Sequence, residues 1–460
     1  MLDLTTKDVL ERKALRVNPC KTCQPAGAMF AALGVHSCMP HSHGSQGCCS
    51  YHRTVLSRHF KEPAIASSSS FTEGASVFGG RSNLNTAVKN IFDMYAPDVI
   101  AVHTTCLSET IGDDLTSYIT DLDLPEGKHV VHCNTPSYVG SHINGFSNMM
   151  MGFMNYLTRK SGALNGKTAI FPGWVNPGDI RELKRIAALM GVPATFFPDQ
   201  SGVLDAPMTG TYAYYPEGGT TLDEIRGLGD SSGLIALGEI IGLAPAEMMK
   251  KKWKVPYALL PLPVGVAYTD NYLIALRNAA TGEDNIRPPV PPELEAERGR
   301  LVDLMLDSGQ YTYQKKAAIF GDPDVVIGLT SLCLEIGMIP RYVITGTPKE
   351  DFTRKIEALF AKYGMEGCTA KANADLFDLH QWIKNEPVDL LIGSSYGKQI
   401  ARAEDIPFVR AGFPVLDRYG GPLLPIVGYG GGMHLIEKIT GALMDRYDRD
   451  CADEDFEVVM

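Results

Sequence analysis

The chain has 460 residues, and its 45% hydrophobic and 21% charged content is typical of a globular protein with sizeable buried cores. The formal net charge of −11 argues against a nucleic-acid-binding protein, which would present a basic face. No apolar run approaches the ~20 residues that a membrane-spanning helix needs. The polar, acidic N-terminus argues against a signal or transit peptide, so we expect a cytoplasmic protein.

Three cysteines of the first third stand at the beginning of predicted helices. Cys23 precedes a helix over 24–33, Cys48 opens a run to residue 60, and Cys106 follows a strand over 98–102 and opens a run to residue 119. A fourth polar segment, 134–141, precedes a long helical run over 143–159. Helix N-termini carry partial positive charge and free N–H groups, which stabilise thiolates. The spacing therefore indicates a soft-metal or iron–sulfur site assembled by tertiary folding.

Other interpretations of the cysteines remain open from spacing alone. Cys20 and Cys23 form a C-x-x-C pair that suits a redox dithiol or half of a zinc site, whereas adjacent Cys48 and Cys49 rarely bind one tetrahedral ion. Several histidines could supply nitrogen ligands: His36, His41, His43 and His52. The remaining cysteines are expected to be small buried hydrophobes or, for the last, incidental: Cys38, Cys133, Cys333, Cys368 and Cys451.

The rest of the chain alternates short apolar strands with helices. Strands are predicted over 167–173, 193–197, 316–323, 342–344 and 389–394, with helices over 179–190, 325–337 and 294–307. This alternation predicts an α/β fold of three doubly wound, Rossmann-like domains with parallel sheets flanked by helices. A proline-rich linker over 287–293 belongs to the second of the three predicted domains, which are 1–165, 166–312 and 313–460. The glycines of 428–432 are weak evidence for nucleotide binding, since a tight turn explains them equally well.

The cysteine-bearing segments resemble one known family. Segments 23–28, 43–48 and 104–114 are similar to the nitrogenase component 1 family, and segments 66–80 and 134–142 are most similar to the beta chains of its molybdenum–iron members. The resemblance covers essentially the whole chain. It implies a subunit of an alpha2-beta2 oxidoreductase that reduces dinitrogen to ammonia, with ATP spent at a partner iron protein.

The resemblance also implies roles for individual residues. Cys23, Cys48, Cys106 and, on oxidation, Ser137 would bind half of an 8Fe–7S P-cluster shared with the alpha chain. Cys20 departs from the family pattern, and we interpret it and Cys49 as bystanders. Three residues are expected to surround the cluster and tune its potential: His43, Tyr51 and Glu73. The molybdenum–iron cofactor and its ligands belong to the alpha chain, so no catalytic residue is assigned here.

Two further sites are expected from the resemblance. Phe78 matches a surface residue where the iron protein homodimer docks, although an ordinary core aromatic is the alternative. Asp303 and Asp307 lie four residues apart on a predicted helix, where a solvated face is the simple explanation. The family implies that they meet Glu62 and the Lys61 carbonyl of a partner beta chain around a calcium or iron cation, which oxygen ligands suit.

Related families provide the alternative functions. The cofactor-assembly scaffold is a carrier and not a reductase, but Ser137 and the segment 68–75 favour the reductase. Protochlorophyllide reductase would match these segments much more weakly. Vanadium and iron-only nitrogenases differ around 43–48 and 77–80, so molybdenum is preferred.

Overall fold

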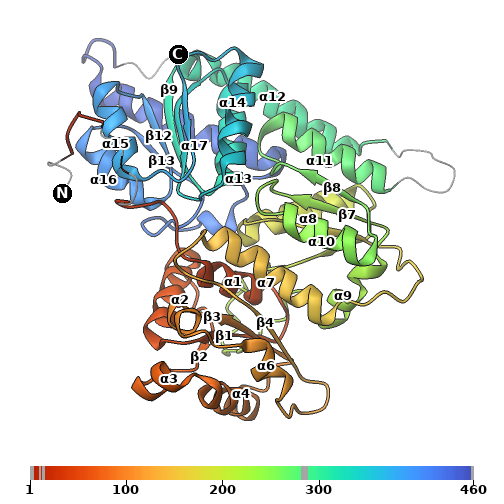
Figure 1. Ribbon diagram of the computed structural model, residues 1–460. Coiled ribbons are helices and arrows are strands. Elements are labelled where there is room, and N and C mark those ends of the chain that lie inside the picture. The colour runs from red at the N-terminus through yellow and green to blue at the C-terminus, as the bar shows by residue number, and fades with distance from the viewer. Residues whose placement is uncertain (1–4, 10–11, 13–15, 281–288, 457–460) are drawn as a thin grey trace. The chain divides into compact units, whose positions relative to one another are not determined.

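The computed structural model describes residues 5–9, 12, 16–280 and 289–456 (Figure 1). The chain divides into two compact units, which we describe separately. The N-terminal unit consists of Thr22–Pro261 with Leu273–Pro289, and the C-terminal unit of Met1–Lys21, Leu262–Tyr272 and Val290–Met460. Within the described part of the chain, no helix is long and apolar enough to cross a membrane.

The first sheet of the N-terminal unit is parallel, in the order β2-β1-β3-β4. Its strands are β1 (Cys38–His43), β2 (Ser67–Ser68), β3 (Val99–Thr104) and β4 (His129–Cys133). Helices α1 (Gln24–Leu33) and α7 (His142–Leu157) cover one face, and α4 (Arg81–Tyr95) covers the other (Figure 1). The apolar stripe of α4 packs on the sheet because its members recur at helical spacing: Leu84, Val88, Ile91 and Phe92.

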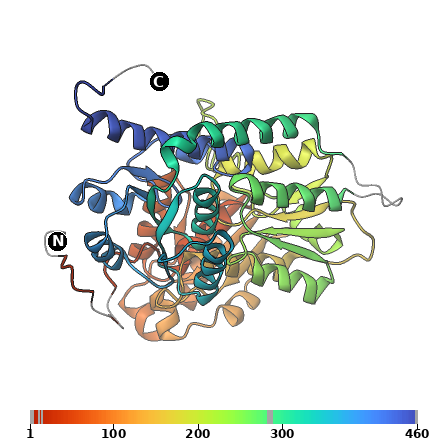
Figure 2. The ribbon, with the colours of Figure 1, turned by 90° about the horizontal axis from the view of Figure 1, so that it is seen from above.

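The second sheet of this unit is also parallel, in the order β6-β5-β7-β8. Its strands are β5 (Thr168–Phe171), β6 (Ala194–Phe196), β7 (Gly233–Leu237) and β8 (Tyr257–Leu260). The winding direction reverses after β6, so α8 (Pro177–Leu189) and α10 (Leu243–Trp253) lie on opposite faces (Figure 2).

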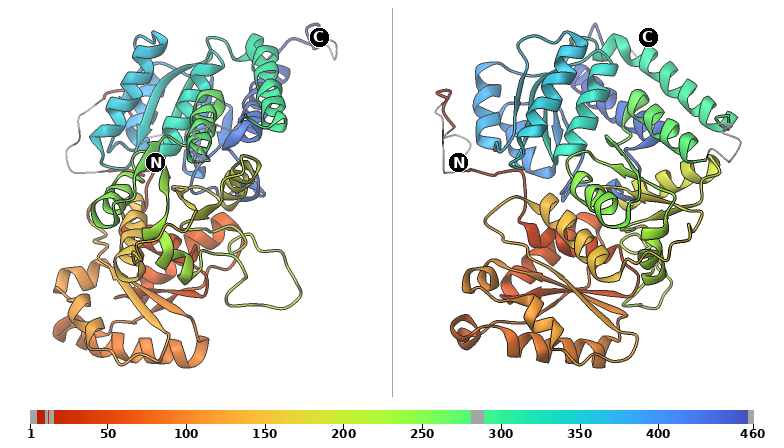
Figure 3. Two further views of the ribbon diagram at one scale, coloured as in Figure 1. Left: turned by 90° about the vertical axis from the view of Figure 1, so that its right-hand side faces the viewer. Right: turned by 45° about the vertical axis from the view of Figure 1, so that its right-hand side comes forward.

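The C-terminal unit contains a five-stranded parallel sheet in the order β11-β10-β9-β12-β13. This 3-2-1-4-5 order is that of dinucleotide-binding folds. The strands are β9 (Lys316–Gly321), β10 (Ile339–Thr345), β11 (Thr369–Lys371), β12 (Leu390–Gly393) and β13 (Phe408–Arg410). Helices α13 (Pro323–Glu335) and α14 (Glu350–Tyr363) lie on one face, and α15 (Leu376–Asn385) and α16 (Lys398–Ala403) on the other (Figure 3).

The predicted α/β class with parallel, helix-flanked sheets is confirmed. Each of the three predicted domains contains one sheet, while the two compact units place the first two sheets together. The three-domain division therefore stays a prediction. The proline-rich linker 287–293 lies partly outside the described residues.

Among the remaining helices, two contain the runs predicted over 48–60 and 294–307. The remaining helices are α2 (Gln46–Phe60), α3 (Glu73–Phe78), α5 (Cys106–Ile111), α6 (Leu115–Thr120), α9 (Leu222–Gly227), α11 (Gly265–Ala279), α12 (Pro292–Thr312) and α17 (Gly428–Asp450), with short 3-10 turns at Leu228–Asp230, Ser395–Gly397 and Gly421–Leu423. The continuous helix predicted over 106–119 is wrong. Gly112 adopts a left-handed conformation (φ 79°) that ends α5, and Asp114 caps the new helix α6.

The glycines of 428–432 have a packing role. A side chain at Gly431 would lie 2.4 Å from the backbone of Ile426, and one at Gly432 would lie 2.9 Å from the side chain of Leu301 on α12. Gly431 must be small because the chain passes close to it just before α17, and Gly432 because α17 packs against α12.

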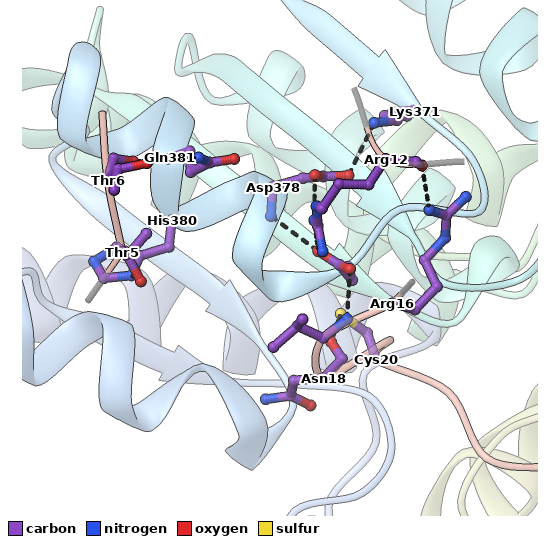
Figure 4. Close-up of polar contacts among 12 residues, drawn as sticks. Thr5, Thr6, Arg12, Arg16, Asn18, Cys20, Lys371, Asp378, His380 and Gln381 are labelled. Atoms are coloured by element: carbon purple, nitrogen blue, oxygen red, sulfur yellow. Dashed lines mark hydrogen bonds and ion pairs between the residues drawn. The ribbon is translucent and has the colours of Figure 1, made fainter. Parts of the chain in front are cut away.

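The N-terminal segment of the chain lies against α15 of the same unit (Figure 4). Arg12 donates hydrogen bonds to Asp375 (2.7 Å) and Asp378 (2.5 Å), and Asp375 also accepts from the Val17 N–H (2.7 Å). The segment ends at Cys20, which is buried in the core of this unit. These contacts fix the chain immediately before the first cysteine motif.

Candidate metal centre

Three of the four predicted ligands follow neighbouring strands of the first sheet. Cys48 follows β1, Cys106 follows β3 and Ser137 follows β4. These strands are adjacent and parallel, so their carboxyl ends meet at one edge of the sheet. That edge is where ligands bind in parallel α/β sheets.

The fourth ligand, Cys23, is placed by the crossing of α1 and α7. A Cβ atom on Gly27 would lie 1.7 Å from the His142 carbonyl oxygen, and one on Gly145 would lie 1.8 Å from the Gln24 carbonyl oxygen. The two helix backbones therefore touch at paired glycines. In addition, the His142 N–H donates to the Thr22 carbonyl (2.9 Å), which fixes the residue before Cys23.

The loops that lead into the helices of Cys48 and Cys106 are in contact with each other. Gly44 has φ +143°, and a Cβ there would lie 1.9 Å from Thr105 Oγ1, so only glycine fits. The His43 carbonyl accepts from the Thr105 N–H (3.0 Å) and from the Ser108 hydroxyl (2.7 Å). These bonds fix the start of α5 and with it Cys106.

The predicted ligands influence one another's pKa values. Burial raises the pKa of Cys23, a hydrogen bond from Ser137 lowers it, and the charge of Cys106 raises it. Burial and the charge of Cys106 raise the pKa of Cys48 to about 11. Three thiols so close to one another resist joint ionisation unless cations offset their charge.

His52, one of the four histidines considered as possible nitrogen ligands, lies beside the thiols, although the family resemblance assigned it no role. Its Nε2 lies 2.9 Å from Cys23 Sγ, and burial lowers the pKa of His52 to about 4, so the ring is neutral near pH 7. The available signal was its position on α2, four residues after Cys48, which places both side chains on one face of the helix.

The three residues predicted to surround the cluster have different environments. His43 is fully buried, with Nε2 2.9 Å from Asp113 and Nδ1 2.9 Å from Ser69. The ring of Tyr51 lies edge-on to that of His52. Glu73 is exposed in the first turn of α3, which packs beside α5.

The two predicted bystanders point elsewhere. Cys20 is packed in the C-terminal unit with Phe320 and Ile344, where burial raises its pKa well above the ordinary value. The Cys49 thiol donates to the Ser67 carbonyl (3.3 Å). All ten cysteines are free; Cys38, Cys133 and Cys333 are buried as expected, while Cys368 and Cys451 are partly exposed.

Phe78 is 89% exposed at the end of α3, so the alternative of a core aromatic is wrong. The loop that follows is anchored to the sheet. Asp113 accepts from the Gly80 N–H (3.2 Å) and from Tyr118 (3.0 Å), besides its contact with His43. Phe78 is therefore an exposed apolar side chain on a fixed support.

The predicted cation ligands lie at the surface. Asp303 and Asp307 are exposed on α12, and Glu62 is exposed just after α2, where Lys61 adopts a left-handed conformation (φ 65°). Among the residues that the structure describes, no three His, Cys, Asp or Glu side chains are arranged to hold one metal ion.

The chemistry of the residues present suits an iron–sulfur group with several iron atoms better than a single metal ion. Thiolates are the usual ligands of such clusters, and three thiols with one hydroxyl converge from four separate segments. Cys106 is exposed, and the large side chains beside the site are open to solvent as well, with Tyr138 67% and Tyr51 53% exposed. One side of the site is therefore available for a second protein surface.

Comparison with known proteins gives consistent matches. Residues 23–444 match the family model of nitrogenase component 1 type oxidoreductases. The chain is 57% identical to the nitrogenase molybdenum–iron protein beta chain of Clostridium pasteurianum, over 100% of both chains. It is 43% identical to that of Frankia alni, over 97% of this chain and 86% of the relative.

Solved structures agree with these matches. A chain of the structure named "Nitrogenase Cp1 at pH 6.5" superposes with a TM-score of 0.97 at 57% identity, covering 100% of both chains. A chain of "Nitrogenase Cp1 at pH 5" superposes with a TM-score of 0.70 at 17% identity, covering 97% of this chain and 92% of that one. The second likeness shows a shared fold alone.

Proposed function

Because the chain belongs to the nitrogenase component 1 type oxidoreductases, we propose that Cys23, Cys48 and Cys106 hold one half of an 8Fe–7S P-cluster. Its full-length relatives are molybdenum–iron beta chains, so the chain is a nitrogenase subunit of the reductase type and not of the assembly-scaffold type. The observation that carries the proposal is the convergence of these thiols and Ser137 on one partly exposed site.

The donor set suits a cluster that changes oxidation state. When bound, the cluster accepts and passes on electrons. Soft thiolates suit reduced iron, whereas a harder oxygen suits more oxidised iron. Ser137 would supply that oxygen on oxidation, and its hydroxyl proton would leave to solvent. The neutral ring of His52 beside Cys23 and the buried contact of Gly44 with Thr105 would limit the access of water to the thiols.

Two protein partners follow from this proposal. An alpha chain covers the open side of the site, supplies the other ligands and carries the molybdenum–iron cofactor. The iron protein homodimer docks at Phe78 and delivers electrons at the expense of ATP. Together they form an alpha2-beta2 enzyme that reduces dinitrogen to ammonia.

We also propose a cation site between two beta chains. Asp303 and Asp307 would bind a calcium or iron ion together with Glu62 and the Lys61 carbonyl of the other beta chain. Asp303 and Asp307 on α12 and Glu62 after α2 are exposed, so a neighbouring chain can reach their carboxylate oxygens. A cytoplasmic location fits the ten free cysteines, because that compartment keeps thiols reduced.

The test of the P-cluster assignment is purification of the chain with its co-expressed alpha chain, followed by iron analysis and EPR. Cys106→Ala should remove the 8Fe–7S signals and most of the cluster iron. Cys49→Ala is the matched control, because Cys49 is next to Cys48 on α2 but its thiol donates to the Ser67 carbonyl. This variant should keep the 8Fe–7S signals and the cluster iron. Equal iron in the two variants would contradict the assignment.

A further inference from the structure

The turn that carries Ser137 is held by side chains to which no role has been given. Residues 134–140 connect β4 to α7, and at the tip Tyr138 and Val139 are exposed. An exposed turn is ordinarily mobile unless its backbone is tied down. Here both ends are bound to the segments that carry the other ligands.

Gln24 ties the turn to α1. It follows Cys23 directly and is buried. Its Nε2 donates to the Val139 carbonyl (3.0 Å), and its Oε1 accepts from Asn148 Nδ2 (3.0 Å). Asn148 Nδ2 also lies 3.3 Å from the Asn134 carbonyl. The amide pair of Gln24 and Asn148 therefore spans both ends of the turn.

A pair of threonines ties the same turn to the Cys106 loop. The Thr135 N–H donates to Thr104 Oγ1 (2.6 Å), and the Thr135 hydroxyl donates to the Thr104 carbonyl (2.7 Å). Both threonines are fully buried, and Thr104 donates in turn to Glu109 (2.5 Å). This contact fixes the beginning of the turn, while Gln24 fixes its end.

We propose that Gln24 is a positioning residue that, through Asn148 and the Val139 carbonyl, holds Ser137 where its hydroxyl reaches the site beside Cys23. The proposal rests on the function given above, in which Ser137 binds the oxidised cluster. A ligand that is held in place loses less conformational entropy when it binds than one on a free turn. Gln24 thus favours the state in which Ser137 is bound.

The expected effect has a definite sign. If Ser137 binds only the oxidised cluster, it stabilises the oxidised state. It therefore lowers the midpoint potential of the couple between the reduced cluster and the oxidised, Ser137-bound cluster. Gln24→Leu removes both amide contacts, frees the turn and should raise this potential toward the value of Ser137→Ala. Because both changes act on the same bond, the double variant should lie no higher than Ser137→Ala alone.

The experiment uses the complex with the alpha chain, with iron content measured first and the potential by EPR-monitored redox titration. Gln200→Leu is the matched control. Gln200 is also buried and donates to a carbonyl of α1, that of Phe30 (3.0 Å), but it makes no contact with the Ser137 turn. It should leave the potential unchanged.

Each outcome decides the proposal. An upward shift for Gln24→Leu, without one for Gln200→Leu, supports it, and full iron with an unchanged potential overturns it. If Gln24→Leu loses iron, Asn148→Ala decides in the same way, because it removes the donor that orients the Gln24 amide and also releases the Asn134 carbonyl. A wild-type potential equal to that of Ser137→Ala would instead reject the role of Ser137 itself.

Discussion

Cys20 and Cys23 are three residues apart, yet their thiols have different surroundings. Cys20 is enclosed by apolar side chains, where burial raises its pKa strongly. Cys23 lies beside a hydroxyl and other thiols at the start of a helix. A thiol whose pKa is raised by burial and by nearby negative charge stays protonated, whereas one at a helix start among donors can bind metal. The immediate environment of each side chain thus distinguishes the proposed ligand from the proposed bystander.

Phe78 gives a prediction at the scale of one residue. Its side chain is almost fully exposed, so Phe78→Ala should change the free energy of unfolding by less than ~0.5 kcal/mol. If the iron protein docks there, the same change should weaken binding by about 2 kcal/mol, or roughly thirtyfold in Kd, as for an aromatic at the centre of an interface. Surface plasmon resonance with the iron protein measures the effect.

Tyr419→Ala is the control for this measurement. Tyr419 is 87% exposed and lies in the C-terminal unit, so it matches Phe78 in size and accessibility. Its substitution should leave binding unchanged. Equal affinities for Phe78→Ala, Tyr419→Ala and the wild type would reject docking at Phe78.

At the scale of elements, the site depends on the contact between α1 and α7. Every residue of α1 is buried, and its glycine faces the backbone of α7 at a distance that no side chain allows. In a densely packed interior, a shift of α1 also moves the residues attached to it, including Cys23. The crossing therefore places Cys23 beside the Ser137 turn.

Gly27→Ala tests this dependence. The added Cβ meets the His142 carbonyl, so α1 and α7 must separate, with an expected loss of ~1–3 kcal/mol in the free energy of unfolding. Because Cys23 moves with α1, the purified complex should also contain less P-cluster iron. Urea denaturation and iron analysis measure the two effects.

Gly299→Ala is the matched control, since Gly299 is in the interior of α12 with nothing near its missing Cβ. Replacing an unhindered helical glycine should stabilise by ~0.5–1 kcal/mol and leave the iron content unchanged. If Gly27→Ala behaved in the same way, close packing of α1 on α7 would not be what places Cys23.

At the scale of the whole molecule, three exposed features of the chain suit contacts with other proteins. The proposed cluster ligands are partly exposed to solvent, Phe78 is an exposed aromatic side chain, and Asp303 and Asp307 lie on an exposed helix face. Exposed apolar and metal-binding side chains of this kind are typical of surfaces that bind a partner.

The carboxylate pair gives a prediction for assembly. Replacing Asp303 and Asp307 by Asn removes both charges that would bind the cation, so contact between beta chains should weaken at least tenfold in Kd, about 1.4 kcal/mol. Analytical ultracentrifugation should then show alpha–beta halves at concentrations where the wild type is a tetramer. A chelator added to the wild type should have the same effect.

The control is Glu357→Gln on α14, which removes an exposed carboxylate elsewhere in the same unit. It should leave the tetramer intact. A tetramer that resists both the chelator and the double substitution would show that no cation at this position holds it together.

The sequence by itself determined the α/β class, the parallel strands and the helix starts at Cys23, Cys48 and Cys106. These depend on hydrophobic periodicity and on Gly and Pro signals, which act over a few residues. Local signals also gave one wrong prediction, a continuous helix over 106–119. The run has helical spacing, but Gly112 ends one helix and Asp114 caps the next, and these end signals outweigh the helix propensity of the run.

Only the tertiary structure decided which side chains meet. His52, the Gln24–Asn148 pair and the contact of Gly44 with Thr105 depend on loops brought together by adjacent parallel strands and by a crossing of helix backbones. It also decided that Phe78 is exposed and that Cys20 is buried in another unit from Cys23. Contacts between residues far apart in the chain follow from packing in three dimensions, and local sequence pattern does not encode them.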